Sequence, residues 1–126
     1  MRSAWQVRPN APQPGTYLTT LACLEESGEG GVIELKFGHG RMIFSMLVLK
    51  TSKGPRAFVN LCPHYAMPLD AGTGTFCNDA GLIECLQHFA LFRPEDGMCI
   101  AGACPGASLD SIPLECDADG RLYIAR

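Results

Sequence analysis

The sequence has 126 residues, of which 47% are hydrophobic and 18% charged, and it carries a net charge of −3 at pH 7. This length and composition indicate one folded domain and exclude a disordered chain, and no run approaches the ~20 apolar residues of a membrane-spanning helix. Residues 1–60 carry a net +3, whereas residues 61–126, which hold six of the seven cysteines, carry a net −6. Nucleic acid is therefore not an expected partner.

The N-terminal half predicts an extended arm followed by strands. Three prolines and a glycine make residues 1–16 an arm, with Trp5 and Val7 as its packing anchors. No apolar signal segment is present there, so a cytoplasmic protein without a membrane anchor is expected. Residues 17–24 are predicted as a strand, and residues 32–37, which alternate with period two, as a half-buried strand.

Two further strands are predicted to form a hairpin that leads to a cysteine. The apolar run at residues 42–49 has no helix caps, Thr51-Ser52-Lys53-Gly54 is a turn signal, and residues 57–61 make the second strand. This hairpin delivers the chain to Cys62.

The C-terminal half predicts short strands and no amphipathic helix. These strands lie at residues 81–84, 91–92, 98–100, 112–116 and 122–124. The last two flank the turn Asp117-Ala118-Asp119-Gly120 as another hairpin. The whole predicts an all-β domain in which residues 60–106 interrupt the strands with loops rich in Cys, His, Pro and Gly, and loops on a rigid scaffold commonly carry chemistry.

Two pairs of metal-ligating residues lie in these loops, Cys62-Pro63-His64 and Cys85-Leu86-Gln87-His88. In a reducing compartment the odd number of cysteines favours metal or cluster ligation over disulfides. A tetrahedral zinc ion would accept two Cys and two His, but its usual signature places the two cysteines in one pair and the two histidines in another. Here each loop mixes the two types, which fits a [2Fe-2S] cluster of mixed ligation.

The two pairs match the C-x-H and C-x2-H boxes of Rieske [2Fe-2S] proteins, and the sequence resembles soluble Rieske ferredoxins over residues 57–125. Further matching residues are Pro68, Leu69, Gly72, Phe92, Gly97, the segment Gly102-Ala103-Cys104-Pro105-Gly106 and Leu109. The resemblance implies one Rieske domain over residues 1–126, an antiparallel β-sandwich with a small cluster-binding subdomain of loops and short strands at about 60–106.

By the same resemblance, the domain holds one [2Fe-2S] cluster per chain. Cys62 and Cys85 would bind the buried iron, and His64 and His88 the outer iron near the surface, while residues 102–106 would cover the cluster. The remaining histidine, His39, lies between two glycines and is expected to be a solvated turn residue.

The sequence departs from the respiratory Rieske proteins in ways that favour a ferredoxin. Met67 and Gln87 stand at the positions of an additional disulfide, and Ala90 and Phe92 replace a Ser and a Tyr that donate hydrogen bonds toward the cluster. Fewer donors predict a potential low in the Rieske range. The second box also has Leu86 and Phe89 where the family commonly has Pro and Gly, and Met67 and Phe89 are interpreted as apolar cover for the cluster or as contacts to a partner.

The other cysteines are interpreted as small residues in or near the core; they are Cys23, Cys77, Cys99, Cys104 and Cys116. A disulfide between Cys99 and Cys104 is an alternative that a reducing compartment disfavours.

The resemblance implies an electron carrier and not an enzyme. The chain would pass one electron from a flavin-dependent ferredoxin reductase to a terminal ring-hydroxylating dioxygenase or a related redox enzyme. With His39 alone left over, the residues lack the two further histidines that a mononuclear oxygenase iron needs. Three alternatives stay open: the Rieske-like small subunit of an assimilatory nitrite reductase, a zinc-binding interaction module, and a redox sensor that uses the spare thiols.

Overall fold

The computed structural model describes residues 4–26, 32–62, 69, 77, 81–85, 90–102 and 107–126. Their helices and strands are, in chain order, η1 (Ala4–Val7), β1 (Tyr17–Thr20), α1 (Leu21–Glu26), β2 (Val32–Phe37), η2 (Gly40–Met42), β3 (Phe44–Thr51), β4 (Gly54–Val59), β5 (Ile83–Glu84), β6 (Leu91–Phe92), β7 (Cys99–Ala101), β8 (Ser111–Ile112), β9 (Leu114–Cys116) and β10 (Arg121–Ile124). Most of this regular structure is strand, which confirms the predicted all-β class. No helix among the described residues has the length and hydropathy needed to cross a membrane.

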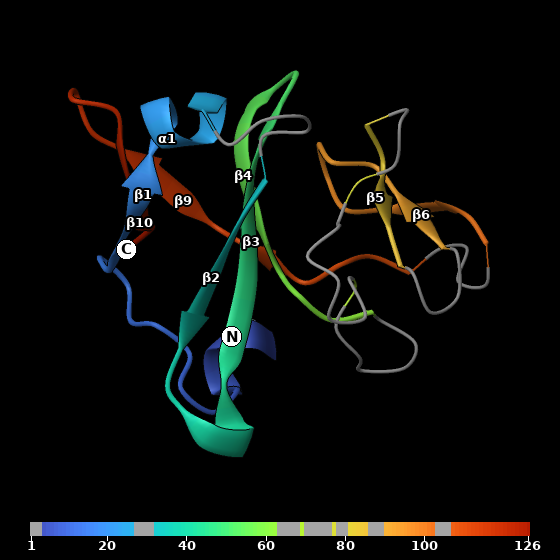
Figure 1. Cartoon of the computed structure of the whole chain (residues 1–126), viewed down its shortest axis with the longest axis horizontal. Helices are drawn as coiled ribbons and strands as arrows, with labels where there is room; N and C mark the ends of the chain where they lie inside the picture. Colours follow the sequence, from blue (N-terminus) through green and yellow to red (C-terminus); the bar gives the residue numbers. More distant parts are fainter. Residues whose placement is uncertain are drawn as a thin grey trace.

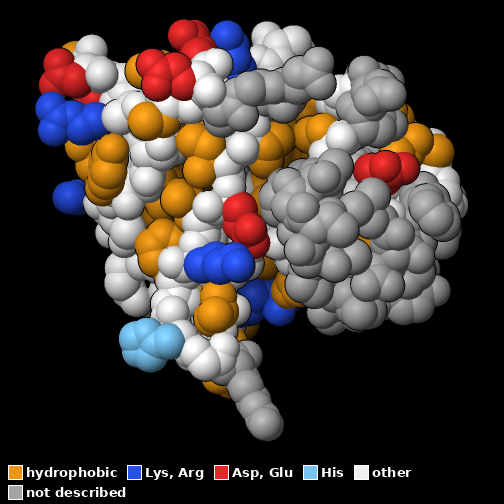
Figure 2. Space-filling view, in the orientation of Figure 1, with side chains coloured by type: hydrophobic (Ala, Val, Ile, Leu, Met, Phe, Trp, Pro, Cys, Tyr) orange, Lys and Arg blue, Asp and Glu red, His pale blue; other side chains and the backbone are white. Residues whose placement is uncertain are grey.

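The strands form three antiparallel sheets, ordered β1-β10-β9, β2-β3-β4-β8 and β5-β6-β7. The second sheet stands in the middle, with β1, β9 and β10 on one side and β5 and β6 on the other (Figure 1). Charged side chains gather along the edge that carries α1 and the turn between β9 and β10, whereas hydrophobic ones show across the sheets below (Figure 2).

The central hairpin, β3 and β4, is buried on both faces by two hydrophobic cores. The sandwich core comprises Trp5, Leu18, Leu24, Phe44, Met46, Val48, Ala57, Val59, Ile112, Leu122 and Ile124. The loop-side core comprises Leu47, Leu49, Phe58, Cys62, Leu69, Ile83, Cys85, Ala90, Phe92, Cys99 and Leu109. Alternate residues of β3 enter different cores, which is why its sequence is an unbroken apolar run, as expected of a strand covered on both sides.

The predicted strand at residues 17–24 is wrong in its second half, because β1 ends at Thr20 and α1 follows. The Thr20 hydroxyl oxygen accepts a hydrogen bond from the Cys23 N–H at 3.1 Å, which caps the helix. Leu24 then turns into the sandwich core and is 1% exposed. The strand therefore ends at Thr20, and the helix that follows places Leu24 in the sandwich core.

Two other predicted strands differ from the strands in the structure. The run at residues 42–49 starts as the 3₁₀ helix η2, and Met42 and Ile43 remain 56% and 44% exposed before β3 begins. The predicted strand at residues 112–116 divides at Pro113, so that β8 pairs with β4 while β9 pairs with β10. Proline has no N–H for a ladder, and the chain passes there from one sheet to another.

The N-terminal arm is anchored by one of its two predicted residues. Trp5 is 1% exposed and packs against Phe44 with ring centroids 6.4 Å apart, as predicted. Val7 is 68% exposed, so its prediction as an anchor is wrong. The arm is also not fully extended, because η1 brings the indole of Trp5 inward while Val7 points to solvent.

The small third sheet is tied to the central hairpin at the turn between β6 and β7. Arg56 Nε donates to the Glu95 carbonyl at 3.1 Å, and Ser52 Oγ donates to the Glu95 carboxylate at 2.9 Å. Gly97 of the same turn accepts from the Leu109 N–H at 2.9 Å and lies against Phe58. These contacts hold the sheet that carries Cys85 in place on the face of the sandwich.

Candidate functional site

The first ligand box begins just beyond the end of β4, at Cys62. Val59 is the last residue of β4, yet the Asn60 N–H still donates to the Ser45 carbonyl at 2.9 Å and keeps the chain attached to β3. Cys62 is 1% exposed and lies in the loop-side core with Phe58. The predicted hairpin therefore delivers the chain to Cys62, at the end opposite to its turn.

The second box begins at Cys85, directly after β5. Strands β5 and β6 pair antiparallel, and the Cys85 N–H donates to the Ala90 carbonyl at 2.9 Å. This bond and the pairing of β5 with β6 fix Cys85 and Ala90, between which the rest of the second box lies in the sequence. Cys85 is 0% exposed.

Cys62 and Cys85 thus reach the same hydrophobic core from two different elements. Both belong to the loop-side core, in which aliphatic and aromatic side chains surround them and solvent reaches neither. Thiolates are the ligands that iron–sulfur clusters require, and an apolar surrounding limits solvent access to such a group. The two cysteines therefore fit the sulfur-ligand half of a [2Fe-2S] site. His64 and His88 lie outside the described residues, as do residues 103–106 of the predicted covering segment.

The residues that replace the respiratory hydrogen-bond donors are buried beside this site. Ala90 and Phe92 are both 0% exposed and belong to the loop-side core, and neither side chain has a hydroxyl group. Met67, Leu86, Gln87 and Phe89, whose roles the sequence left open, lie outside the described residues.

The remaining cysteines divide into buried and exposed ones. Cys99 is 5% exposed within the loop-side core and Cys77 packs against it, which agrees with their prediction as core residues. Cys23 and Cys116 are exposed, so for them that prediction is wrong. Burial raises the pKa of the Cys77 thiol, and a raised pKa lowers the fraction of reactive thiolate. Cys104, and with it the alternative disulfide to Cys99, falls outside the described residues.

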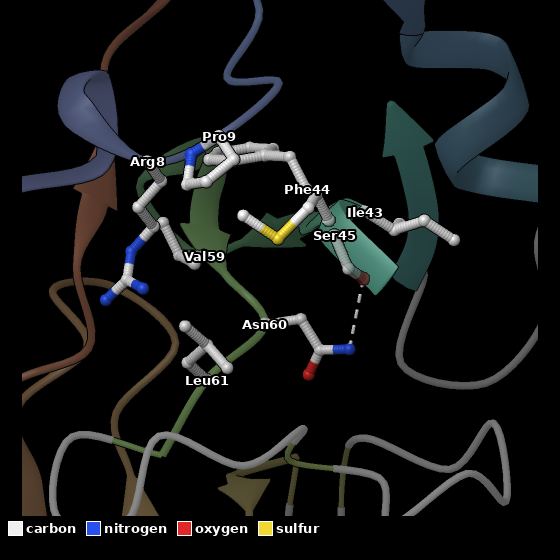
Figure 3. Close-up of a pocket in the computed structure, with 9 residues that line it drawn as sticks. Arg8, Pro9, Ile43, Phe44, Ser45, Val59, Asn60 and Leu61 are labelled. Carbon is white, nitrogen blue, oxygen red and sulfur yellow. Dashed lines mark hydrogen bonds between the residues drawn. The ribbon is translucent and has the colours of Figure 1, made fainter. Parts of the chain in front are cut away.

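His39 and a cavity beside the N-terminal arm lie at a different place from the two cysteines. His39 is exposed next to η2, as predicted for a solvated turn residue. A cavity of about 350 Å³ lies between the N-terminal arm and the chain that leads to Cys62, and its lining includes Arg8, Phe44 and Asn60 (Figure 3). Its walls are largely apolar, and neither Cys62 nor Cys85 lines it.

The family comparison covers most of the chain. The Rieske [2Fe-2S] domain family matches residues 21–113. The chain belongs to the Rieske family. Both buried cysteines and both ligand boxes lie within the matched residues, and the family assignment gives the chain a single [2Fe-2S] cluster. No curated protein matches the sequence at a significant level.

Solved structures show the same Rieske fold. The ferredoxin of carbazole 1,9a-dioxygenase from Nocardioides aromaticivorans IC177 is 22% identical, with a TM-score of 0.58 over 87% of this chain and 97% of that one. The Sphingomonas yanoikuyae B1 ferredoxin is 23% identical, with a TM-score of 0.59 over 89% and 98%. A reduced complex between oxygenase and ferredoxin in carbazole 1,9a-dioxygenase matches at 20% identity and a TM-score of 0.62, over 88% of this chain and 28% of that one. The Rieske β-sandwich predicted from the sequence is therefore confirmed.

Sequence reasoning missed polar residues that connect distant parts of the described chain. Asn60, Arg56 and Glu95 contact groups up to 43 residues away in the sequence, so no local pattern marks them. Only the position of Asn60, two residues before Cys62, could have drawn attention to it.

Proposed function

We propose that this Rieske protein is a ferredoxin-type electron carrier, which takes one electron from a flavin-dependent ferredoxin reductase and passes it to a terminal ring-hydroxylating dioxygenase or a related redox enzyme. The observation that carries this proposal is the burial of Cys62 and Cys85 in one core of a Rieske-family domain. When bound, a Rieske cluster stores a single electron.

The residues of this chain would serve the cluster by supplying its ligands, holding them in place and excluding water. Cys62 and Cys85 would supply the two thiolates from inside the loop-side core, and His64 and His88 would supply the two imidazoles. Phe58, Phe92 and the aliphatic residues of that core would keep solvent from the sulfur ligands, and the hydrogen bond from the Cys85 N–H to the Ala90 carbonyl would hold Cys85 in place. Fixed ligands suit electron transfer because little has to rearrange when the charge changes.

The number of histidines available as iron ligands favours an electron carrier over an oxygenase. The three histidines include only one, His39, beyond the proposed ligands, and His39 is exposed and far from both cysteines in the sequence. A mononuclear oxygenase iron needs two histidines and a carboxylate. Likeness to ferredoxins over nearly their whole length supports the same conclusion.

The environment of the proposed ligands supports a potential in the low part of the Rieske range of about −150 to +300 mV. Ala90 and Phe92 provide no hydroxyl donor, although both are buried in the core that contains Cys62 and Cys85. Hydrogen bonds to ligand sulfur stabilise the reduced state, and their absence from these two side chains removes that stabilisation.

Electron paramagnetic resonance of dithionite-reduced protein, purified without oxygen, tests the ligand set. A Rieske signal is expected in the wild type and should be lost in Cys62→Ser, Cys85→Ser, His64→Ala and His88→Ala. Cys99→Ser and His39→Ala are matched controls that should keep it, since the first is buried in the same core and the second is an exposed histidine. A colourless protein that contains zinc, or an unchanged signal in either ligand-cysteine variant, would contradict the assignment.

Stopped-flow absorbance tests the electron route separately. NADH and a flavin-dependent ferredoxin reductase should reduce the protein, and a ring-hydroxylating terminal oxygenase should then reoxidise it. If dithionite reduces the protein but the reductase does not, the reductase step is wrong even though the cluster is present. If the oxygenase leaves the reduced protein unchanged, the acceptor belongs to another class.

A further inference from the structure

We propose that Asn60 is a positioning residue that fixes the first ligand loop to the sandwich, so that the environment of the cluster depends on its side-chain amide. This inference rests on the proposed role of Cys62 as a ligand. Cys62 follows Asn60 by two residues, and the segment between Asn60 and Leu69 contains both Cys62 and His64.

Asn60 is buried and uses both ends of its amide. It is 2% exposed, and Thr19 is the other buried polar residue among those described. Its Nδ2 donates to Ser45 Oγ at 3.2 Å and to Glu34 Oε2 at 3.3 Å. Its Oδ1 accepts from the Leu69 N–H at 2.9 Å. Figure 3 shows the amide nitrogen turned to Ser45 and the amide oxygen turned away from it.

The partners of Asn60 lie on two different parts of the molecule. Glu34 and Ser45 are directly joined, because Ser45 Oγ donates to Glu34 Oε2 at 2.7 Å, and they belong to β2 and β3 of the central sheet. Leu69 lies beyond the first ligand box and is 0% exposed in the loop-side core. The Asn60 side chain therefore connects the rigid sheet to the far end of the segment that carries the proposed ligands.

This connection needs a side chain that donates on one side and accepts on the other. An amide does both, whereas a carboxylate only accepts and an aliphatic side chain does neither. Because the group is buried, a lost partner is not replaced by bulk water, and the loop must move to satisfy what remains. Outer residues of this kind affect metal affinity through the ligands that they orient.

Exchanging the amide of Asn60 with the carboxylate of Glu34 isolates this role. Asn60→Asp places a second carboxylate against Glu34 and removes the donor, so we expect roughly 10-fold faster loss of visible cluster absorbance under chelator, as for other outer-shell changes. We also expect altered g-values in the reduced spectrum. Adding Glu34→Gln to Asn60→Asp restores one amide and one carboxylate with unchanged size and net charge, and it should recover most of the cluster lifetime. Glu34→Gln alone keeps a donor and an acceptor and should stay close to the wild type.

Val48→Ala is the control for simple destabilisation, because Val48 lies in the sandwich core, which contains neither Cys62 nor Cys85. It should lower the urea midpoint without changing the g-values or the reduction potential. If Asn60→Asp lowers the urea midpoint but leaves spectrum, potential and cluster lifetime as in the wild type, Asn60 stabilises the fold only and does not position the ligands.

Ser45→Ala decides the case in which Asn60→Asp does not fold. It keeps Asn60 and removes one of its acceptors. We expect cluster loss to be faster and the g-values to change as in Asn60→Asp, but by a smaller amount. Wild-type values in Ser45→Ala, with no recovery in the exchanged pair, would overturn the positioning role. A wild-type spectrum in Cys62→Ser would instead overturn the ligand assignment on which the inference rests, so the two failures are distinguishable.

Discussion

Gly97 occupies a position where a side chain would have to displace an aromatic ring. Its φ of +75° lies in the left-handed region, and a Cβ there would lie 2.7 Å from Phe58 Cε1 and 3.2 Å from Leu109 Cβ. Phe58 is 0% exposed and packed in the loop-side core, so its ring has little freedom to move. The glycine therefore allows the turn between β6 and β7 to approach the central hairpin closely.

We predict that Gly97→Ala lowers the free energy of unfolding by about 2–4 kcal/mol, from backbone strain together with overpacking. Gly40→Ala is the matched control, because its φ is +73° but no atom of the described residues, its chain neighbours and own helix aside, lies within 4 Å of the added Cβ. It should cost about 1–2 kcal/mol from backbone strain alone. Urea unfolding measures both, and equal losses would show that the contact with Phe58 has no energetic consequence.

Thr20 ends one element and begins the next. It is the last residue of β1, and its hydroxyl accepts the Cys23 N–H at the start of α1. We predict that Thr20→Ala lowers the free energy of unfolding by about 1 kcal/mol, whereas Thr20→Ser, which keeps the hydroxyl, changes it little. Equal effects of the two substitutions in urea unfolding would show that the methyl group matters and the cap does not.

The Asp117 carboxylate accepts hydrogen bonds from several residues of the hairpin of β9 and β10. Asp117 Oδ1 accepts from the N–H of Arg121 at 2.8 Å and of Asp119 at 3.0 Å, and Tyr123 donates to Oδ2 at 3.2 Å. The hydrogen bond from the Arg121 backbone is the main reason that the pKa of Asp117 lies below its ordinary value of 3.8. A lowered pKa means that the folded state favours the charged form.

We predict that a carbon-detected NMR titration gives Asp117 a pKa below 3.8 in the folded protein. The carboxylate then contributes its full stabilisation above the unfolded pKa, and this contribution is lost as pH falls through the folded pKa. Asp117→Asn should accordingly speed exchange of the Arg121 amide hydrogen at neutral pH. A measured pKa at or above 3.8 would contradict the carboxylate's role in the turn.

At the scale of the whole molecule, the described residues form two hydrophobic cores on opposite faces of the hairpin of β3 and β4. Met46 and Leu47 are neighbours on β3 and both are 0% exposed, yet Met46 belongs to the sandwich core and Leu47 to the loop-side core with Cys62 and Cys85. Damage to one face of the hairpin should therefore have a different effect on the cluster from damage to the other.

We predict that Leu47→Ala and Met46→Ala each lower the free energy of unfolding by about 2–5 kcal/mol. Only Leu47→Ala should speed cluster loss beyond what its lower stability explains, because its cavity opens in the core that contains the two cysteines. Urea unfolding and bleaching of visible absorbance, measured on the same samples, give the comparison. If the rate of cluster loss depends on the free energy of unfolding in the same way in both variants, the two cores act as one unit.

Local patterns in the sequence determined the fold class, the ligand boxes and the family. The boxes are recognisable because Cys62 and His64, and Cys85 and His88, are separated by one and two residues. Period-two alternation and turn residues located β2 and the two hairpins for the same reason, since these features depend on neighbours in the chain. Helix α1 was missed because Cys23, and not a Glu, stands three residues after Thr20, so no capping box marks the start of the helix.

Tertiary structure alone decided the long-range contacts of Asn60 and Phe58. Asn60 contacts Glu34, Ser45 and Leu69 at sequence separations of 26, 15 and 9 residues, and Phe58 meets Gly97 across two sheets. The division of β3 between two cores also depends on which sheets come to lie on its faces. Such contacts arise from packing between elements, and the spacing of residues along one chain carries no record of them.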